Sequence, residues 1–140
     1  MNPATTGALA PAIAGVRTSL HVLGAAVWSG GQITMAGLVP TARRVGAGAP
    51  RALAVAFARV QWPAYALLVV TGIWNVSATH GGQGTAWQVL LGVKVAVVAL
   101  AGLSAWLHSR SRSRAGLAAW GAACSLSSVA ALVMGVFLAG

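Results

Sequence analysis

Four long apolar stretches follow one another along the chain, and short polar segments separate them. The stretches run from about 18 to 39, 60 to 77, 85 to 107 and 115 to 138. A helix needs roughly 20 mostly apolar residues to cross the hydrocarbon core of a bilayer, and each stretch is about that long. The pattern therefore predicts an all-α fold, a bundle of four transmembrane helices that forms a single integral membrane domain over residues 1–140.

Two prolines help to place the helix boundaries. Pro40 directly follows the first stretch and predicts its end, because proline lacks the backbone N–H that a helix interior requires. Pro63 lies near the start of the second stretch, where a missing N–H costs least. The segment from 51 to 61 is also helical in composition. It either extends the second helix into the cytoplasm or lies along the membrane interface.

Arginines gather in two of the three connecting segments. The segment between the second and third stretches, NVSATHGGQGT, contains no Lys or Arg. Because cytoplasmic loops carry an excess of positive charge, the two Arg-rich segments are predicted to be cytoplasmic and both termini to lie outside. Anionic lipids of the bilayer are predicted partners of Arg43, Arg44, Arg110, Arg112 and Arg114. The predicted location is a bacterial-type cytoplasmic (plasma) membrane, crossed several times.

Composition excludes several classes of protein. Hydrophobic types make up 58% of the chain, only 6% is charged, and Asp and Glu are absent, whereas a soluble domain is about 25% charged. The net charge is +9, and most of the positive residues form short clusters between the apolar stretches, which argues against nucleic-acid binding. Without carboxylates, neither an acid–base pair nor a serine triad can form. The sequence leans away from an enzyme, and no residue is predicted to be catalytic.

Small residues recur every four positions along the last stretch. Such spacing lets helices approach closely in lipid, either within this bundle or in an oligomer, and the sequence leaves both open. The small residues are Ala119, Ala123, Ser127, Ala131, Gly135 and Ala139.

The chain has a single cysteine, Cys124, so an intrachain disulfide is ruled out. Its position in the middle of the last stretch predicts that it is buried.

His21 is the first candidate for chemistry, since polar groups inside a membrane are costly. It lies about one turn into the first stretch. At helical periodicity it shares a face with Trp28, Gln32 and Met35, at offsets of 7, 11 and 14 residues. Two interpretations stay open: His21 forms a hydrogen bond to another helix, or it binds a ligand or carries a proton.

Lys94, the only lysine, is the second candidate. It lies about nine residues into the third stretch, roughly 13 Å along a helix, and no carboxylate exists to pair with it. It either reaches to the outer headgroups, is neutral, or pairs with a group from outside the chain. That group would be a lipid phosphate, a haem propionate, another anion or a second subunit.

Under the predicted topology, several polar residues lie in the outer half of the membrane. His21, Lys94, Thr71, Asn75 and Met134 fall at similar depths, so one outward-opening pocket is expected to collect groups from all four helices. Whether His21 and Lys94 meet in it stays open.

His80 lies in the outer loop beside two glycines. It is either a cation-capturing residue or an ordinary surface histidine.

Three segments resemble a known family. The run RTSLHVLGAAVWSGG, from Arg17 to Gly31, resembles the opening of the copper resistance protein D (CopD) membrane domain, with a His, a Trp seven residues on and a Gly-Gly. The stretch from Tyr65 to Trp74, with its Thr-Gly pair, is similar to the second helix of that domain. WQVLLGVK, ending at Lys94, is similar to its third. The resemblance covers roughly residues 17–110.

A related pattern occurs in HemJ-type membrane proteins, which have four helices and bind haem b. In that family a His on helix one and a Lys on helix three are important, and by position these are His21 and Lys94. Features of the HemJ C-terminal part are absent from this chain.

These resemblances imply a function and a site. The CopD resemblance implies copper handling at or across the cytoplasmic membrane, and the HemJ resemblance implies a haem b-binding redox protein. A third alternative is an accessory or structural subunit of a larger membrane complex. In the first two, His21 is the expected ligand of the metal or haem. The expected supporting residues are Trp28, Gln32, Lys94, Thr71 and Asn75, and the secondary ligands are Met35, Met134 and His80.

Overall fold

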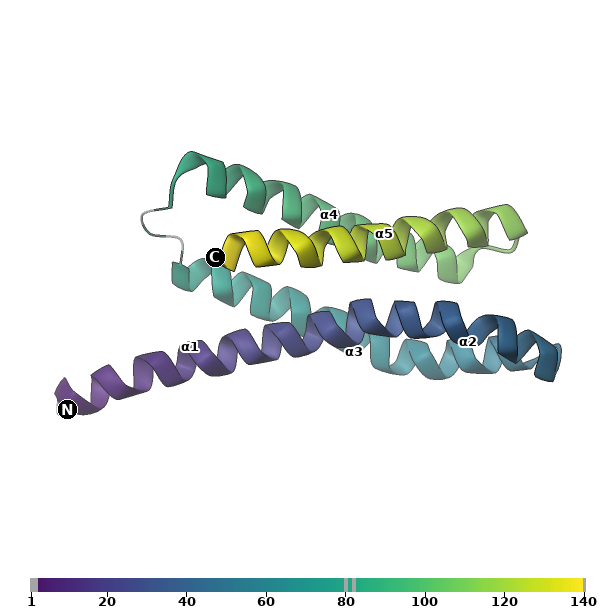
Figure 1. Cartoon of the computed structure of the whole chain (residues 1–140), viewed down its shortest axis with the longest axis horizontal. Helices are drawn as coiled ribbons and strands as arrows, with labels where there is room; N and C mark the ends of the chain where they lie inside the picture. The colour runs from purple at the N-terminus through teal and green to yellow at the C-terminus, as the bar shows by residue number, and fades with distance from the viewer. Residues whose placement is uncertain (1–2, 80, 82, 140) are drawn as a thin grey trace. The chain divides into compact units, whose positions relative to one another are not determined.

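The computed structural model of the chain describes residues 3–79, 81 and 83–139, with side chains from residue 11 onward. Within these residues every regular element is helical (Figure 1). The elements are α1 (Pro3–Ala25), a π-helical turn η1 (Ala26–Gly30), α2 (Gly31–Val45), α3 (Ala49–Thr79), α4 (Thr85–Arg110) and α5 (Arg114–Ala139). Four helical runs are long and apolar enough to cross a membrane. The predicted all-α fold with four such helices is confirmed.

The first helical run is longer than predicted. It was expected over 18–39 with an end at Pro40, and this is wrong: α1, η1 and α2 continue without a break from Pro3 to Val45. Pro11 and Pro40 lie inside α1 and α2. Membrane-spanning helices tolerate internal prolines because neighbouring groups satisfy the freed backbone carbonyl. The run ends at Val45 instead, where the N–H of Gly46 bonds the carbonyl oxygen of Ala42 at 3.3 Å.

The second run is also longer, whereas the last two match the prediction closely. α3 covers 31 residues, so the segment from 51 to 61 extends this helix, one of the two alternatives. Pro63, expected near the helix start, therefore lies well inside α3. α4 and α5 begin and end within three residues of the predicted bounds.

The helices pack as two compact units. One consists of Met1–Gly31 and Gly37–Gly81, and the other of Gln32–Ala36 and Gly82–Gly140. The first is built mainly from α1 against α3, and the second from α4 against α5. The single-domain assignment stays a prediction.

In the first unit the backbones of α1 and α3 nearly touch. A Cβ atom placed on Gly24 would lie 3.1 Å from the carbonyl oxygen of Ala64 and 3.1 Å from the amide nitrogen of Leu68. Four residues further along, Trp28 is 2% exposed. Its ring centroid lies 4.5 Å from that of Tyr65 and 6.1 Å from that of Trp62. Glycine brings the helices together, and the aromatic cluster fills the next turn.

In the second unit α4 and α5 run antiparallel. Trp87 Nε1 donates to the carbonyl oxygen of Leu138 at 3.2 Å near one end. His108 Nδ1 lies 2.9 Å from the carbonyl oxygen of Leu117 at the other. Within the predicted small-residue seam, Ser127 and Ala131 are buried. The middle of the seam therefore packs inside this unit.

Candidate ligand site at His21

His21 is held by a hydrogen bond to α3 that fixes its tautomer. Its Nδ1 lies 3.0 Å from Thr71 Oγ1. Thr71 is 2% exposed, and its hydroxyl donates to the carbonyl oxygen of Leu67 at 2.6 Å. A hydroxyl has one proton to donate, so Thr71 Oγ1 accepts from His21, and Nδ1 carries the hydrogen. The lone pair of the neutral imidazole is therefore on Nε2.

The residue after Thr71 makes room for the same ring. A Cβ atom on Gly72 would lie 3.3 Å from His21 Cε1, tighter than an ordinary contact. Both residues of the Thr-Gly pair of α3 therefore position His21. Thr71 forms a hydrogen bond with its ring, and Gly72 leaves space for the ring.

A second polar pair lies one turn away on both helices. Arg17 Nε donates to Asn75 Oδ1 at 2.7 Å. Arg17 precedes His21 by four residues and Asn75 follows Thr71 by four, so the two pairs form neighbouring rungs between antiparallel helices. The sequence interpretation gave Arg17 no role at the site. Its four-residue spacing from His21 was the signal that could have found it.

The π-helical turn divides the face that was predicted to carry His21, Trp28, Gln32 and Met35. His21 and Trp28 contact α3 in the first unit, whereas Gln32 and Met35 belong to the second. η1 occupies Ala26–Gly30, so it contains Trp28 and separates His21 from Gln32. A π turn holds more residues than an α turn, so it shifts the angular position of everything that follows.

Gln32 forms a hydrogen-bonded group with α5 residues of the second unit. Its Nε2 lies 2.8 Å from Cys124 Sγ and 3.5 Å from Ser128 Oγ. Ser125 Oγ donates to its Oε1 at 3.2 Å. Both ends of the amide are thus engaged, which is what a structural polar group inside an apolar protein requires. Cys124 is buried, as expected.

Lys94 extends toward the α4 N-terminus. Its Nζ lies 3.0 Å from where a Cβ on Gly135 would be. At about 1.5 Å per residue, Lys94 is about 5 Å from the midpoint of α4, and Gly135 is about 13 Å from that of α5. Since Trp87 and Leu138 mark the same end of both helices, the side chain runs outward along the pair. This geometry is that of a lysine reaching from an apolar span toward the headgroups.

The remaining predicted ligands are not gathered around His21 in the first unit. Lys94, Met35 and Met134 belong to the second unit, where both methionines are half-buried. His80 lies outside the described residues. Across the described part of the chain, no group of three or more His, Cys, Asp or Glu side chains is placed to hold a metal ion. The site therefore consists of His21 with Thr71 and Gly72, and Arg17 with Asn75 beside them.

Comparison with protein families, curated proteins and solved structures found no match to this chain.

Proposed function

We propose that this protein handles copper ions at or across a bacterial-type plasma membrane, and that His21 binds the ion through Nε2. The His21–Thr71 hydrogen bond carries the proposal. Metal-ligating histidines usually donate their other ring N–H to a fixed acceptor, which sets the tautomer and orients the ring. Thr71 is such an acceptor, because its own proton is committed to Leu67.

Copper in this proposal is transported cargo. A transport site must bind firmly enough to load and weakly enough to release. His21 is oriented, and among the described residues no metal cage surrounds it, which suits that requirement. Copper(I) also prefers soft sulfur ligands. Three sulfur-containing residues of the second unit are candidate secondary ligands: Cys124, Met35 and Met134.

Haem b binding is the second candidate, and the Arg17–Asn75 pair favours it. Asn75 fixes Arg17 Nε, and the guanidinium lies one turn from His21, where it would pair with a propionate. His21 Nε2 would be the axial ligand. The macrocycle would lie away from the α1–α3 contact, because their backbones are too close at Gly24. Because this steric restriction affects a large macrocycle more than a single ion, copper is the first candidate ligand and haem b the second.

The proposed orientation has both termini outside. It is supported by the arginines of two connections and by Lys94, which extends toward the α4 end remote from Arg110. Positive residues at cytoplasmic ends and long cations reaching for headgroups are both typical of such proteins.

The experiment is to purify wild type, His21→Ala and His108→Ala in detergent, load them with copper(I), and measure bound copper and the visible spectrum. His108 is the matched control, because its ring bonds a backbone carbonyl at the α4–α5 connection. We expect wild type and His108→Ala to bind copper stoichiometrically, and His21→Ala to lose at least tenfold in affinity, about 1.4 kcal/mol.

Other outcomes select the alternatives. A Soret band in wild type that disappears in His21→Ala would select haem b. Neither copper nor haem, together with stoichiometric co-purifying membrane proteins, would select the accessory-subunit function. In cells, copper accumulation that is unchanged by His21→Ala would contradict the copper proposal.

A further inference from the structure

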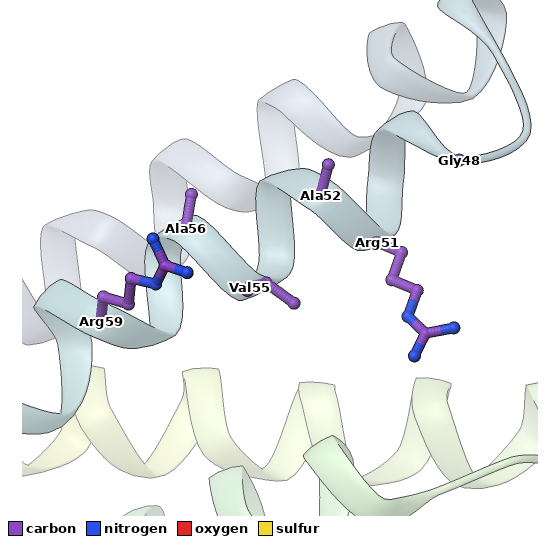
Figure 2. A pocket seen from close by; sticks show the side chains of 6 residues that line it. All are labelled: Gly48, Arg51, Ala52, Val55, Ala56 and Arg59. Atoms are coloured by element: carbon purple, nitrogen blue, oxygen red, sulfur yellow. The ribbon is translucent and has the colours of Figure 1, made fainter.

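The N-terminal part of α3 carries a groove on its own surface, with a volume of about 440 Å³ (Figure 2). All of the residues that line it are exposed. They are Gly48, Arg51, Ala52, Val55, Ala56 and Arg59.

The groove has an apolar floor with a cation at each end. Arg51, Val55 and Arg59 recur every four residues and so form one stripe along the helix. Ala52 and Ala56 lie beside this stripe. The two arginines are eight residues apart, about 12 Å of helical rise. Figure 2 shows their guanidinium groups at either end of the apolar segment.

The length of α3 places this groove at a membrane surface. The helix covers 31 residues, about 46 Å at the usual rise, whereas the hydrocarbon core is about 30 Å thick. With the Thr79 end at one surface, about 20 residues cross the core, and the other boundary falls near Arg59. Arg51 then lies in or just outside the headgroup layer.

No acidic side chain of this protein is available to the arginines of the groove. The sequence contains no Asp or Glu, so no acidic side chain of this chain can pair with Arg51 or Arg59. Guanidinium groups bind phosphate oxygens through charge-assisted, often bidentate hydrogen bonds. Basic segments at the membrane surface attract acidic lipids.

We propose that this groove binds an acidic phospholipid of the adjacent leaflet. Its phosphate oxygens pair with the guanidinium group of Arg59 at the boundary of the hydrocarbon core, and its acyl chains enter the core beyond Arg59. Its glycerol and headgroup lie over Ala52, Val55 and Ala56, and Arg51 at the far end of the groove adds to the attraction for the acidic headgroup. This site is independent of the copper proposal, because it uses neither His21 nor its neighbours.

The test places the purified, delipidated protein in phosphatidylcholine bilayers that contain phosphatidylglycerol. Phosphatidylglycerol retained through a detergent wash is then counted by native mass spectrometry. The variants are Arg51→Gln/Arg59→Gln and, as a control with the same loss of charge, Arg112→Gln/Arg114→Gln. The control arginines are also predicted to attract acidic lipids, but they do not line the groove, so lipid held by them alone is expected to leave every protein in the wash. We expect wild type and the control to retain the lipid in the groove, and the groove variant to bind it at least tenfold more weakly, because the phosphate-binding group and the second attracting charge are both removed.

Four results would overturn the proposal. Two concern the lipid: undiminished retention by the groove variant, or an equal loss in the control, which would make the effect one of net charge. Displacement of phosphatidylglycerol by inorganic phosphate would make the ligand a soluble phosphate. Binding of an acidic protein through Arg51 and Arg59, with lipid excluded, would make the groove a protein interface. Circular dichroism of each variant checks that the helices are intact.

Discussion

The hydroxyl group of Thr71 decides which nitrogen of His21 can bind a ligand. Its proton is used in the 2.6 Å bond to Leu67, so the oxygen accepts from His21 Nδ1. The side chain is buried, where competition from water is weakest. Thr71 is therefore a positioning residue for His21 and would not itself touch the ligand.

We expect Thr71→Val to weaken ligand binding by about 10–100-fold, because it keeps the shape of the side chain and removes the acceptor that orients the ring. The measurement is the affinity of the detergent-purified protein for copper(I). Thr79→Val is the control, since the Thr79 hydroxyl donates to the carbonyl oxygen of Asn75 within its own helix. Equal affinities of wild type and Thr71→Val, with unchanged thermal unfolding, would show that His21 needs no such orientation.

At the scale of helices, the contact between α1 and α3 sets the position of His21. Gly24 lies three residues after His21, and its missing side chain allows the two backbones to approach. Any larger side chain would meet backbone atoms of Ala64 and Leu68, which cannot move aside as a flexible side chain can. Small residues at helix crossings have this role in membranes generally.

Gly24→Leu is expected to destabilise the protein by about 1–3 kcal/mol through this overpacking. Gly37→Leu is the matched control, because no atom outside its own helix lies within 4 Å of the added Cβ. Thermal unfolding in detergent measures both. A Gly24→Leu protein as stable as Gly37→Leu would mean that the close approach of α1 and α3 contributes nothing to stability.

Hydrophobic pattern identified the four helices but not all of their ends. Long apolar stretches identify spans because the bilayer sets their length. The end at Pro40 was wrong because proline disrupts a membrane-spanning helix less than the sequence rule assumes. The full length of α3 was left open because its first residues are only moderately apolar and carry arginines.

The site was predicted in part. His21, Thr71 and Asn75 were predicted because they are polar residues inside apolar stretches. In the structure, His21 and Thr71 are connected by a hydrogen bond. Arg17 was missed because it directly precedes the first predicted stretch, which was placed from residue 18. Gln32 was grouped with His21 because a constant helical period was assumed, and η1 changes that period in the intervening residues.

For the whole molecule, charge distribution sets the orientation in the bilayer. Arginines lie in or beside two of the three connections, whereas the segment from 75 to 85 has neither Lys nor Arg. Because the chain has no Asp or Glu to neutralise these arginines, their full positive charge favours a cytoplasmic location for the segments that carry them. The connection at Gln83 is therefore expected outside, and the one at Ala47 inside.

Single-cysteine variants test this orientation. In a Cys124→Ala background, Gln83→Cys is expected to react with a membrane-impermeant maleimide in intact cells, because the proposed orientation places it outside. Ala47→Cys is expected to react only after permeabilisation. Both positions are exposed in the structure. The reverse labelling pattern would invert the topology and place His21 in the cytoplasmic half.

The π-helical turn at Ala26–Gly30 also affects how the first helical run can evolve. Residues before the turn are constrained by packing on α3, and Gln32–Ala36 are constrained by the second unit. The additional residue in the π turn rotates the residues after the turn about the helix axis, relative to those before it. No loop is needed for this change of facing. Selection can then change the part that packs on α3, which carries His21, separately from the part that carries Gln32. The five-residue length of the turn, more than the identity of those residues, is the property that must be conserved.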